Sequence, residues 1–153
     1  MTLTGKESVE LGILTPADKF FSSFVKQLLD FESVSDHVHE AKLHKGDGHS
    51  IGSVKQWTYT IDGKVATCKE SFEAIDEQNK TLTFNLFGGD VSPQYKTLKA
   101  HLKVIDKGNN KRGAIAKWTY EYEKIREDIA PPCAYLDLTT KFTQDLDAHL
   151  IKA

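Results

Sequence analysis

The sequence predicts one α+β domain, residues 1–153, in which an antiparallel sheet covers a long C-terminal helix. Seven segments alternate apolar and polar residues, as strands with one buried face do. Six of these segments follow one another through short turns, which is typical of an antiparallel meander. The segment 133–151 instead contains neither Gly nor Pro and repeats apolar side chains every four positions, which indicates an amphipathic helix.

The N-terminal part predicts a strand followed by helical structure. In "SVELGI", residues 8–13, the side chains of Val9, Leu11 and Ile13 share one face. The period then changes at "TPADKFFSSFVKQLL", where Thr15 suits the N-cap and Pro16 suits the first helical position. The polar stretch "DFESVSD" interrupts the apolar face, so we expect either two short helices or one helix and a turn.

The six consecutive strands are predicted from alternation and from the turns between them. Alternation slips near Ala41, which indicates a bulge, and Asp62-Gly63 is a strong hairpin signal. The predicted strands cover residues 37–43, 53–61, 64–75, 80–87, 95–105 and 114–124. Their apolar face carries aromatic side chains, several with a polar tip: Trp57, Tyr59, Phe72, Phe84, Trp118, Tyr120 and Tyr122.

The C-terminal helix follows Pro131-Pro132, which cannot lie inside a helix. Its apolar stripe consists of Leu138, Phe142, Leu146 and Leu150. No other predicted element is large enough to cover the apolar face of the sheet. Polar-tipped aromatic residues between sheet and helix fit two interpretations, a pocket for an amphipathic ligand or ordinary core packing.

Composition narrows the class of protein. The chain has 20 Lys and Arg against 22 Asp and Glu, so we expect neither nucleic-acid binding nor polybasic attachment to membranes. No apolar run approaches the roughly 20 residues that span a bilayer, so stable membrane insertion is not expected. The first residues lack a signal-peptide pattern, and Cys68 and Cys133 form no motif, which favours a cytoplasmic protein with reduced thiols.

Three stretches in order along the chain resemble the plant major latex protein family: "WTYTIDGK", "AIDEQNK" and "WTYEYEK". That family belongs to the superfamily of the major birch-pollen allergen and the pathogenesis-related class-ten proteins. The resemblance extends from "LTGKESVELGI" to "DLDAHLIK". Many members carry Trp at the position of Gly48, so the loop "GDGHSIG" is closer to that of the class-ten relatives, and the role of Gly48 stays open.

The resemblance implies a helix-grip, START-like fold with a seven-stranded sheet, two short helices after the first strand, and an internal hydrophobic cavity. It also implies a non-enzymatic, monomeric protein that carries or buffers hydrophobic or amphipathic molecules, such as lipids, sterols, flavonoids or hormones, in plant defence or stress. No cofactor or metal is expected. Carried over by strand position, the expected cavity wall is Phe24, Leu28, Val38, Trp57, Tyr59, Thr67, Glu70, Leu82, Phe84, Leu98, Ala100, Leu102, Trp118, Tyr120, Tyr135, Leu138, Phe142 and Leu146.

Two alternatives to a passive carrier remain open at the level of the sequence. Glu70 is predicted to face inward, and a buried carboxyl has a raised pKa that suits a general acid or base, so the chain could be a cavity enzyme. A regulatory module with a protein partner is the other alternative. The connection "TIDGKVA" is a tight hairpin without a gate loop, which disfavours a receptor of the abscisic-acid type.

Two polar clusters are weaker candidates for sites. Gly46, Gly48 and Gly52 have nearly the spacing of a nucleotide-binding loop, but such a loop must open a helix, whereas the alternating strand "SVKQWTYTI" follows here. We therefore interpret the glycines as a turn. His37 and His39 share one strand face opposite to Val38, so we expect them to point outward as solvated side chains without a metal.

Overall fold

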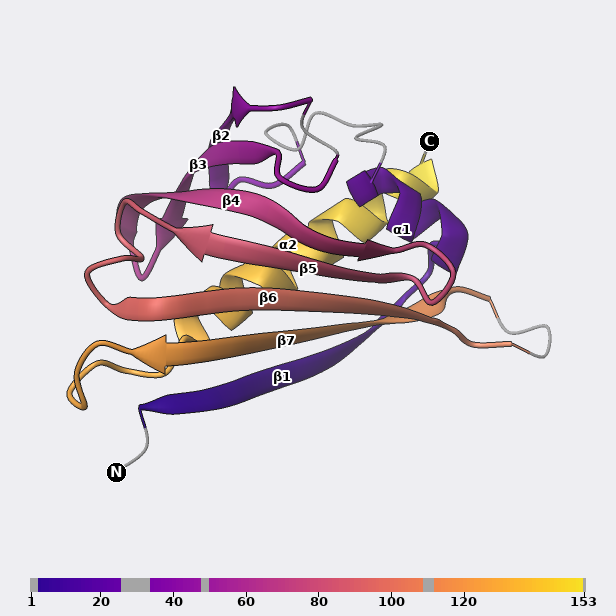
Figure 1. Cartoon of the computed structure of the whole chain (residues 1–153). Helices are drawn as coiled ribbons and strands as arrows, with labels where there is room; N and C mark the ends of the chain where they lie inside the picture. Colours follow the sequence, from indigo (N-terminus) through magenta and orange to yellow (C-terminus); the bar gives the residue numbers. More distant parts are fainter. Residues whose placement is uncertain (1–2, 26–33, 48–49, 109–111, 153) are drawn as a thin grey trace.

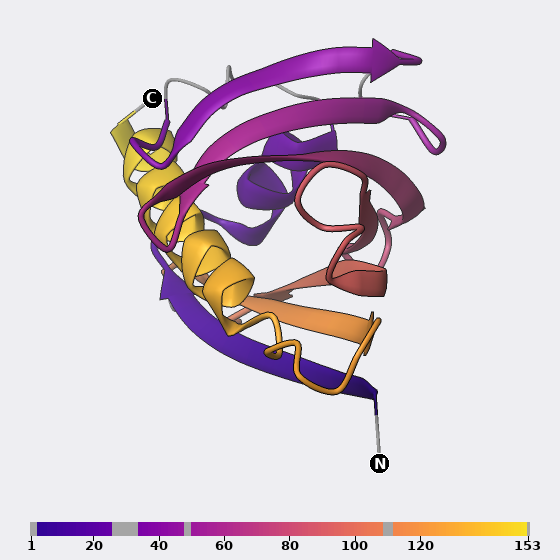
Figure 2. The same ribbon diagram turned by 90° about the vertical axis from the view of Figure 1, so that its left-hand side faces the viewer.

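The computed structural model describes residues 3–25, 34–47, 50–108 and 112–152. In this part of the chain a seven-stranded antiparallel sheet curves around a long helix (Figures 1 and 2). The strands lie in the order β1-β7-β6-β5-β4-β3-β2. The elements are β1 (Thr4–Ile13), α1 (Ala17–Val25), β2 (Val38–Lys45), β3 (Val54–Ile61), β4 (Lys64–Asp76), β5 (Thr81–Phe87), β6 (Tyr95–Asp106), β7 (Ala114–Lys124) and α2 (Cys133–Lys152).

The predicted meander is confirmed, because β2 to β7 pair in sequence order and β1 then pairs with β7. The helix α1 begins just after Pro16 and buries Phe20, Phe21 and Phe24, as its apolar face predicted. The second of the two short helices considered in the sequence analysis falls on residues 26–33, which lie outside the described residues.

Curvature of the sheet comes from irregular pairing at several strands. Register shifts occur in β2 on both sides of Ala41, in β4 between Phe72 and Ala74, and in β6 between Tyr95 and Thr97. An extra residue in one strand bends it and increases its twist. The predicted irregularity in β2 is confirmed. The sheet as a whole is strongly curved, and α2 lies diagonally across its open side (Figure 2).

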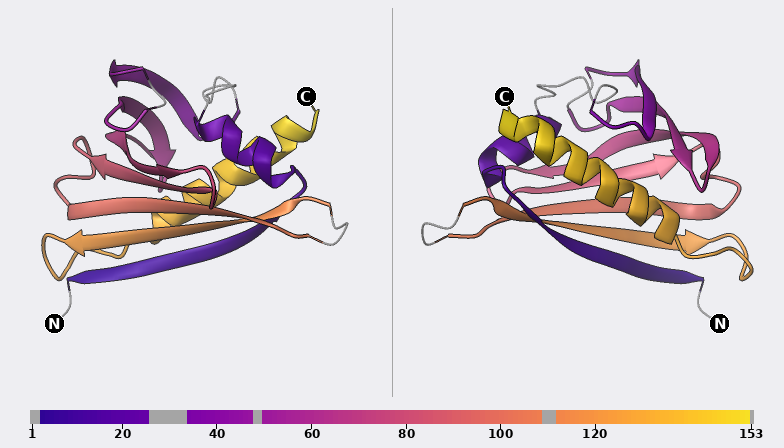
Figure 3. Two further views of the ribbon diagram at one scale, coloured as in Figure 1. Left: turned by 45° about the vertical axis from the view of Figure 1, so that its right-hand side comes forward. Right: turned by 180° about the vertical axis from the view of Figure 1, so that it is seen from behind.

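Both helices lie on the concave side of the sheet (Figure 3), and the core cluster combines side chains from the sheet and from both helices. Phe20 of α1, Leu98 of β6 and Leu146 of α2 are buried completely. Phe24 of α1 places its ring 5.8 Å from that of Trp118 in β7, measured between centroids. Neither helix in the described ranges has the length and apolar character needed to cross a bilayer.

The C-terminal half of α2 is tied to the corner between β1 and α1. The Asp147 carboxylate accepts hydrogen bonds from the backbone N–H of Leu14 at 3.0 Å, and from the N–H and hydroxyl of Thr15 at 2.9 and 2.6 Å. The Lys19 ammonium donates to the Leu150 carbonyl oxygen at 2.8 Å, near the end of the helix. These bonds join segments that are more than 130 residues apart in the chain.

Asp147→Asn should lower the free energy of unfolding by about 2 kcal/mol, measured by urea denaturation. The amide keeps one acceptor but loses the charge, and turns a donor toward the donors of Leu14 and Thr15. The matched control is Asp137→Asn on the exposed side of the same helix, which should change stability by less than about 0.5 kcal/mol. Equal effects of the two substitutions would show that the corner does not depend on this carboxylate.

Candidate ligand-binding pocket

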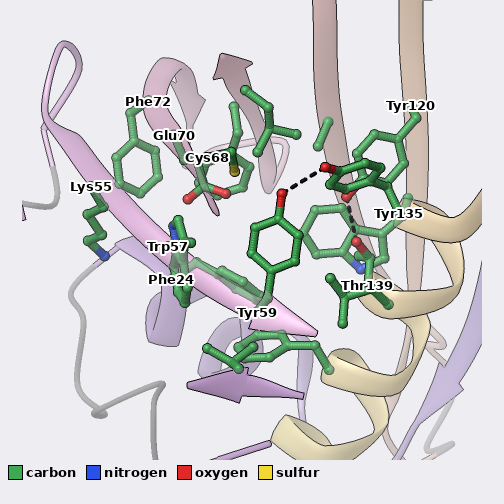
Figure 4. A pocket seen from close by; sticks show the side chains of 17 residues that line it. Phe24, Lys55, Trp57, Tyr59, Cys68, Glu70, Phe72, Tyr120, Tyr135 and Thr139 are labelled. Atoms are coloured by element: carbon green, nitrogen blue, oxygen red, sulfur yellow. Dashed lines mark hydrogen bonds between the residues drawn. The ribbon is translucent and has the colours of Figure 1, made fainter. Parts of the chain in front are cut away.

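A pocket lies between α2 and the concave face of β3 to β7 (Figure 4). The volume open to the centre of a water molecule is about 110 Å³. The lining is predominantly apolar and aromatic, with a few polar groups. Its members are Phe24, Val38, Lys55, Trp57, Tyr59, Cys68, Glu70, Phe72, Phe84, Leu86, Ala100, Trp118, Tyr120, Tyr135, Leu138, Thr139 and Phe142.

Most of the side chains expected in a cavity wall line this pocket. The structure brings together Phe24, Val38, Trp57, Tyr59, Glu70, Phe84, Ala100, Trp118, Tyr120, Tyr135, Leu138 and Phe142. This arrangement is consistent with the internal cavity that the sequence predicted. Leu28 lies outside the described residues.

Five other residues expected in the wall do not line the pocket. Leu82, Leu98, Leu102 and Leu146 are at most 1% exposed and belong to the packed core. Thr67 was expected on the same face as Glu70, but residues three apart on a regular strand point to opposite faces. Its backbone N–H and carbonyl bind Asp90 in the loop after β5 instead, each at 2.8 Å.

Several lining residues were missing from the expected wall: Lys55, Cys68, Phe72, Leu86 and Thr139. For three of them, strand alternation predicts that they share a face with residues of the expected wall. Lys55 is two residues before Trp57, Cys68 is two before Glu70, and Leu86 is two after Phe84. Phe72 belongs to the predicted apolar face, and the structure adds it to the pocket wall.

Two tyrosine hydroxyls of the pocket are bound to side chains of α2. The Tyr59 hydroxyl lies 2.7 Å from that of Tyr135, and the Tyr120 hydroxyl 2.5 Å from that of Thr139 (Figure 4). The sequence left two interpretations of the polar-tipped aromatic residues, a ligand pocket or core packing. The hydroxyls of Tyr59 and Tyr120 have partners within the protein.

Trp118 shows the same use of a polar tip at a fully buried position. Its indole N–H donates to the hydroxyl of Thr143 at 2.9 Å. Thr143 itself is completely buried. The indole therefore contributes its apolar face to the pocket, while its donor is used to hold the helix.

The phenol and thiol groups of the pocket are held in their neutral forms. Burial raises the pKa of Tyr59 and Tyr120 above the ordinary value and raises that of Tyr135 to about 12. Burial also raises the pKa of the Cys68 thiol to about 12. These side chains carry no charge at neutral pH, so an unreactive, apolar character prevails on this side of the pocket.

Glu70 and Lys55 bring ionisable groups to the other side. They are directly opposite each other in the β3–β4 pairing, so both side chains extend from the same face of the sheet. Burial raises the pKa of Glu70 to about 7, against the opposing effects of the Lys55 charge and a hydrogen bond from Trp57. Burial also lowers the pKa of the Lys55 ammonium, although the Glu70 carboxylate opposes this shift.

The described residues of the glycine-rich loop, 46–47 and 50–53, belong to a connection between two strands. It connects β2 to β3, and its Asp47 carboxylate accepts bonds from the N–H and hydroxyl of Ser50 at 2.9 and 2.6 Å and from the Ser53 hydroxyl at 2.9 Å. Gly46 has φ +81°, and a Cβ there would lie 2.7 Å from the Ser53 oxygen. A carboxylate of the loop itself thus occupies donors that a phosphate would need, and Gly48 lies outside the described residues.

The histidines of β2 do not gather into a metal site in the described part of the chain. His39 is exposed, and its Nε2 lies 2.5 Å from the Thr60 hydroxyl. Among the described residues no group of three or more His, Cys, Asp or Glu side chains could hold a metal ion.

Comparison with known proteins gives a consistent set of similarities. Residues 2–153 match the profile of the Pathogenesis-related protein Bet v 1 family. The chain is 34% identical to MLP-like protein 43 of Arabidopsis thaliana, over 98% of this chain and 95% of that protein. It is 38% identical to major latex protein 149 of Papaver somniferum, over 97% and 92%. The crystal structure of major latex-like protein 151 from Panax ginseng aligns with a TM-score of 0.89 at 32% identity, over 96% and 97% of the two chains.

Thr143→Val should reduce the free energy of unfolding by about 1–3 kcal/mol, because the buried Trp118 N–H loses its acceptor while the volume is unchanged. Thr140→Val is the matched control, since the Thr140 hydroxyl bonds only the Leu136 carbonyl within the helix among the contacts described. We expect a change below about 0.5 kcal/mol for the control. If the Trp118 indole resonance in NMR spectra is unmoved by Thr143→Val, the assigned bond is wrong.

Glu70→Gln should remove a pH dependence from stability. The folded-state pKa of about 7 lies above the ordinary 4.5, so the folded protein keeps a proton that the unfolded chain releases between these values. Wild-type stability therefore falls as pH rises through this window. The free energy of unfolding of Glu70→Gln, taken relative to that of wild type, should therefore be about 1–3 kcal/mol larger at pH 8 than at pH 4. Urea denaturation at the two pH values measures it.

The control for this pH effect is Glu77→Gln in the exposed turn after β4. It should follow the wild-type stability profile between pH 4 and pH 8. The control corrects the wild-type profile for other pH effects. If the corrected stability stays level or rises between pH 5 and 7, the burial of Glu70 is contradicted.

Proposed function

The chain belongs to the Pathogenesis-related protein Bet v 1 family, and on that premise we propose that it binds hydrophobic or amphipathic small molecules in the pocket beneath α2. It carries or buffers such molecules without converting them. The observation that supports this proposal is the pocket itself, whose walls are aromatic and aliphatic while its few polar groups lie at particular points.

Binding would draw mainly on the burial of apolar ligand surface. A ligand that buries about 300 Å² of apolar area gains about 7 kcal/mol before the entropic costs of association. Because the polar tips of Tyr59, Tyr120 and Trp118 are bonded to α2, the ionisable groups left in the lining are chiefly Glu70 and Lys55. The pocket therefore favours ligands that are largely apolar and carry a small polar group.

The proposal extends to setting and assembly. We place this function in the plant cytoplasm, in a monomeric protein that takes part in defence or stress responses. Support comes from full-length similarity to plant major latex proteins and from the balanced charge of the chain.

A cavity enzyme is the second candidate, because a carboxyl with a pKa of about 7 in an apolar pocket is suited to proton transfer. This candidate requires turnover of a bound molecule. It would be favoured if a ligand recovered from the native tissue were converted by wild type and left unchanged, though still bound, by Glu70→Gln.

The binding proposal is tested by filling the pocket. Ala100 is buried in mid-β6 and lines the pocket, so Ala100→Phe should weaken binding of the fluorescent probe 1-anilinonaphthalene-8-sulfonate by about tenfold or more. Ala74→Phe, at an exposed position of β4, should leave the affinity unchanged. Circular dichroism would establish that both variants are folded. Unaltered affinity in folded Ala100→Phe would place the binding site elsewhere.

A further inference from the structure

We propose that Lys55 is a reversible covalent anchor for hydrophobic aldehydes, whose carbonyl carbon forms an imine with the lysine amine inside the pocket. This inference rests on the proposed function, since it concerns the same pocket. It goes further by naming a chemical class of ligand and the atom that holds it.

The position of Lys55 carries the proposal. Among the pocket-lining residues in the described part of the chain, Lys55 provides the only primary amine. Its Nζ lies 5.9 Å from the centroid of the Trp57 ring, within the apolar lining and not on the outer face of the sheet. A ligand that enters for its apolar surface is therefore brought next to a nucleophile.

The environment favours the reactive form of this amine. In water a lysine is almost entirely protonated at pH 7, and an ammonium group cannot attack a carbonyl. Burial lowers the pKa of Lys55 and so increases the fraction of neutral amine. An amine desolvated in an apolar pocket is a known route to a reactive lysine.

Glu70 supplies the second group that imine formation needs. It lies directly opposite Lys55 in the β3–β4 pairing and lines the same pocket, between Trp57 and Phe72 in Figure 4. Because burial raises its pKa to about 7, both its acid and its base form are populated at neutral pH. The carboxyl can therefore give up a proton in one step and take one in the next.

The reaction balances with water as the only other product. The Lys55 nitrogen adds to the carbonyl carbon, and a proton passes from nitrogen to the carbonyl oxygen, which gives a carbinolamine. Glu70 then protonates that hydroxyl, which leaves as water while the nitrogen lone pair forms the C=N bond. The remaining N–H proton returns to the Glu70 carboxylate, and the reverse sequence releases the aldehyde.

The pocket also changes the equilibrium of this step. Imines of simple amines hydrolyse readily in dilute solution, whereas a bound aldehyde beside the amine reacts as if at a much higher concentration. The aromatic walls hold the carbon skeleton of the ligand after the bond has formed. Aldehydes with a flat apolar body are therefore selected over small, hydrophilic ones.

The test is reductive trapping of full-length protein with 2-naphthaldehyde and sodium cyanoborohydride at pH 7.5, followed by peptide mass mapping. We expect one naphthylmethyl group on Lys55, added several-fold faster than on exposed Lys103 of β6, because burial lowers the pKa of the Lys55 ammonium and leaves more of it as free amine. Lys55→Arg should abolish this adduct, and Glu70→Gln should slow its formation by about tenfold or more. Lys103→Arg, the matched control, should keep it.

A competitor without a carbonyl group tests the same site in wild-type protein, so that the result does not depend on the folding of a variant. In wild-type protein, 2-naphthalenemethanol should protect Lys55 from labelling while exposed lysines react as before. Labels distributed among surface lysines, or an adduct undiminished by Lys55→Arg, would overturn the inference. If 1-anilinonaphthalene-8-sulfonate binds with pocket dependence but Lys55 takes no label, the covalent anchor is wrong and the carrier function stands. If neither probe enters the pocket, both proposals fail.

Discussion

Four polar side chains, spaced every four residues along α2, fix the helix relative to the sheet. Tyr135 bonds β3, Thr139 and Thr143 bond β7, and Asp147 bonds the corner between β1 and α1. Residues at this spacing lie along one side of a helix, so the four bonds form a ladder parallel to its axis. The ladder sets the height of α2 above the sheet, and the pocket occupies the space that this height leaves.

The ladder also decides what chemistry the pocket retains. It engages the polar tips of Tyr59, Tyr120 and Trp118, which an empty binding site would otherwise present to a ligand. Glu70 and Lys55 line the same pocket, at the end away from these bonds (Figure 4). The pocket thus separates two sets of polar groups. The tips of Tyr59, Tyr120 and Trp118 hold the helix, and Glu70 and Lys55 are the groups assigned to the proposed ligand.

Local patterns predicted most of the fold, since alternation and a four-residue repeat are visible in short stretches of sequence. The ladder could not be predicted in this way. The bond between Tyr59 and Tyr135 joins residues 76 positions apart, and only the folded register shows that Thr143 lies beneath Trp118. For the same reason parity placed Glu70 in the pocket correctly but could not distinguish pocket-lining positions from core positions such as Leu98.

The irregular pairings in β2, β4 and β6 have a consequence for how this protein can diverge. They bend the backbone itself, so the hollow of the sheet does not depend on any one lining side chain. The frame persists while much of the sequence changes, as the TM-score of 0.89 at 32% identity with the ginseng protein illustrates. For the ligand-binding function proposed above, such a frame would let the choice of ligand change through substitutions on the inner surface, with Lys55 and Glu70 among the positions where this would matter most.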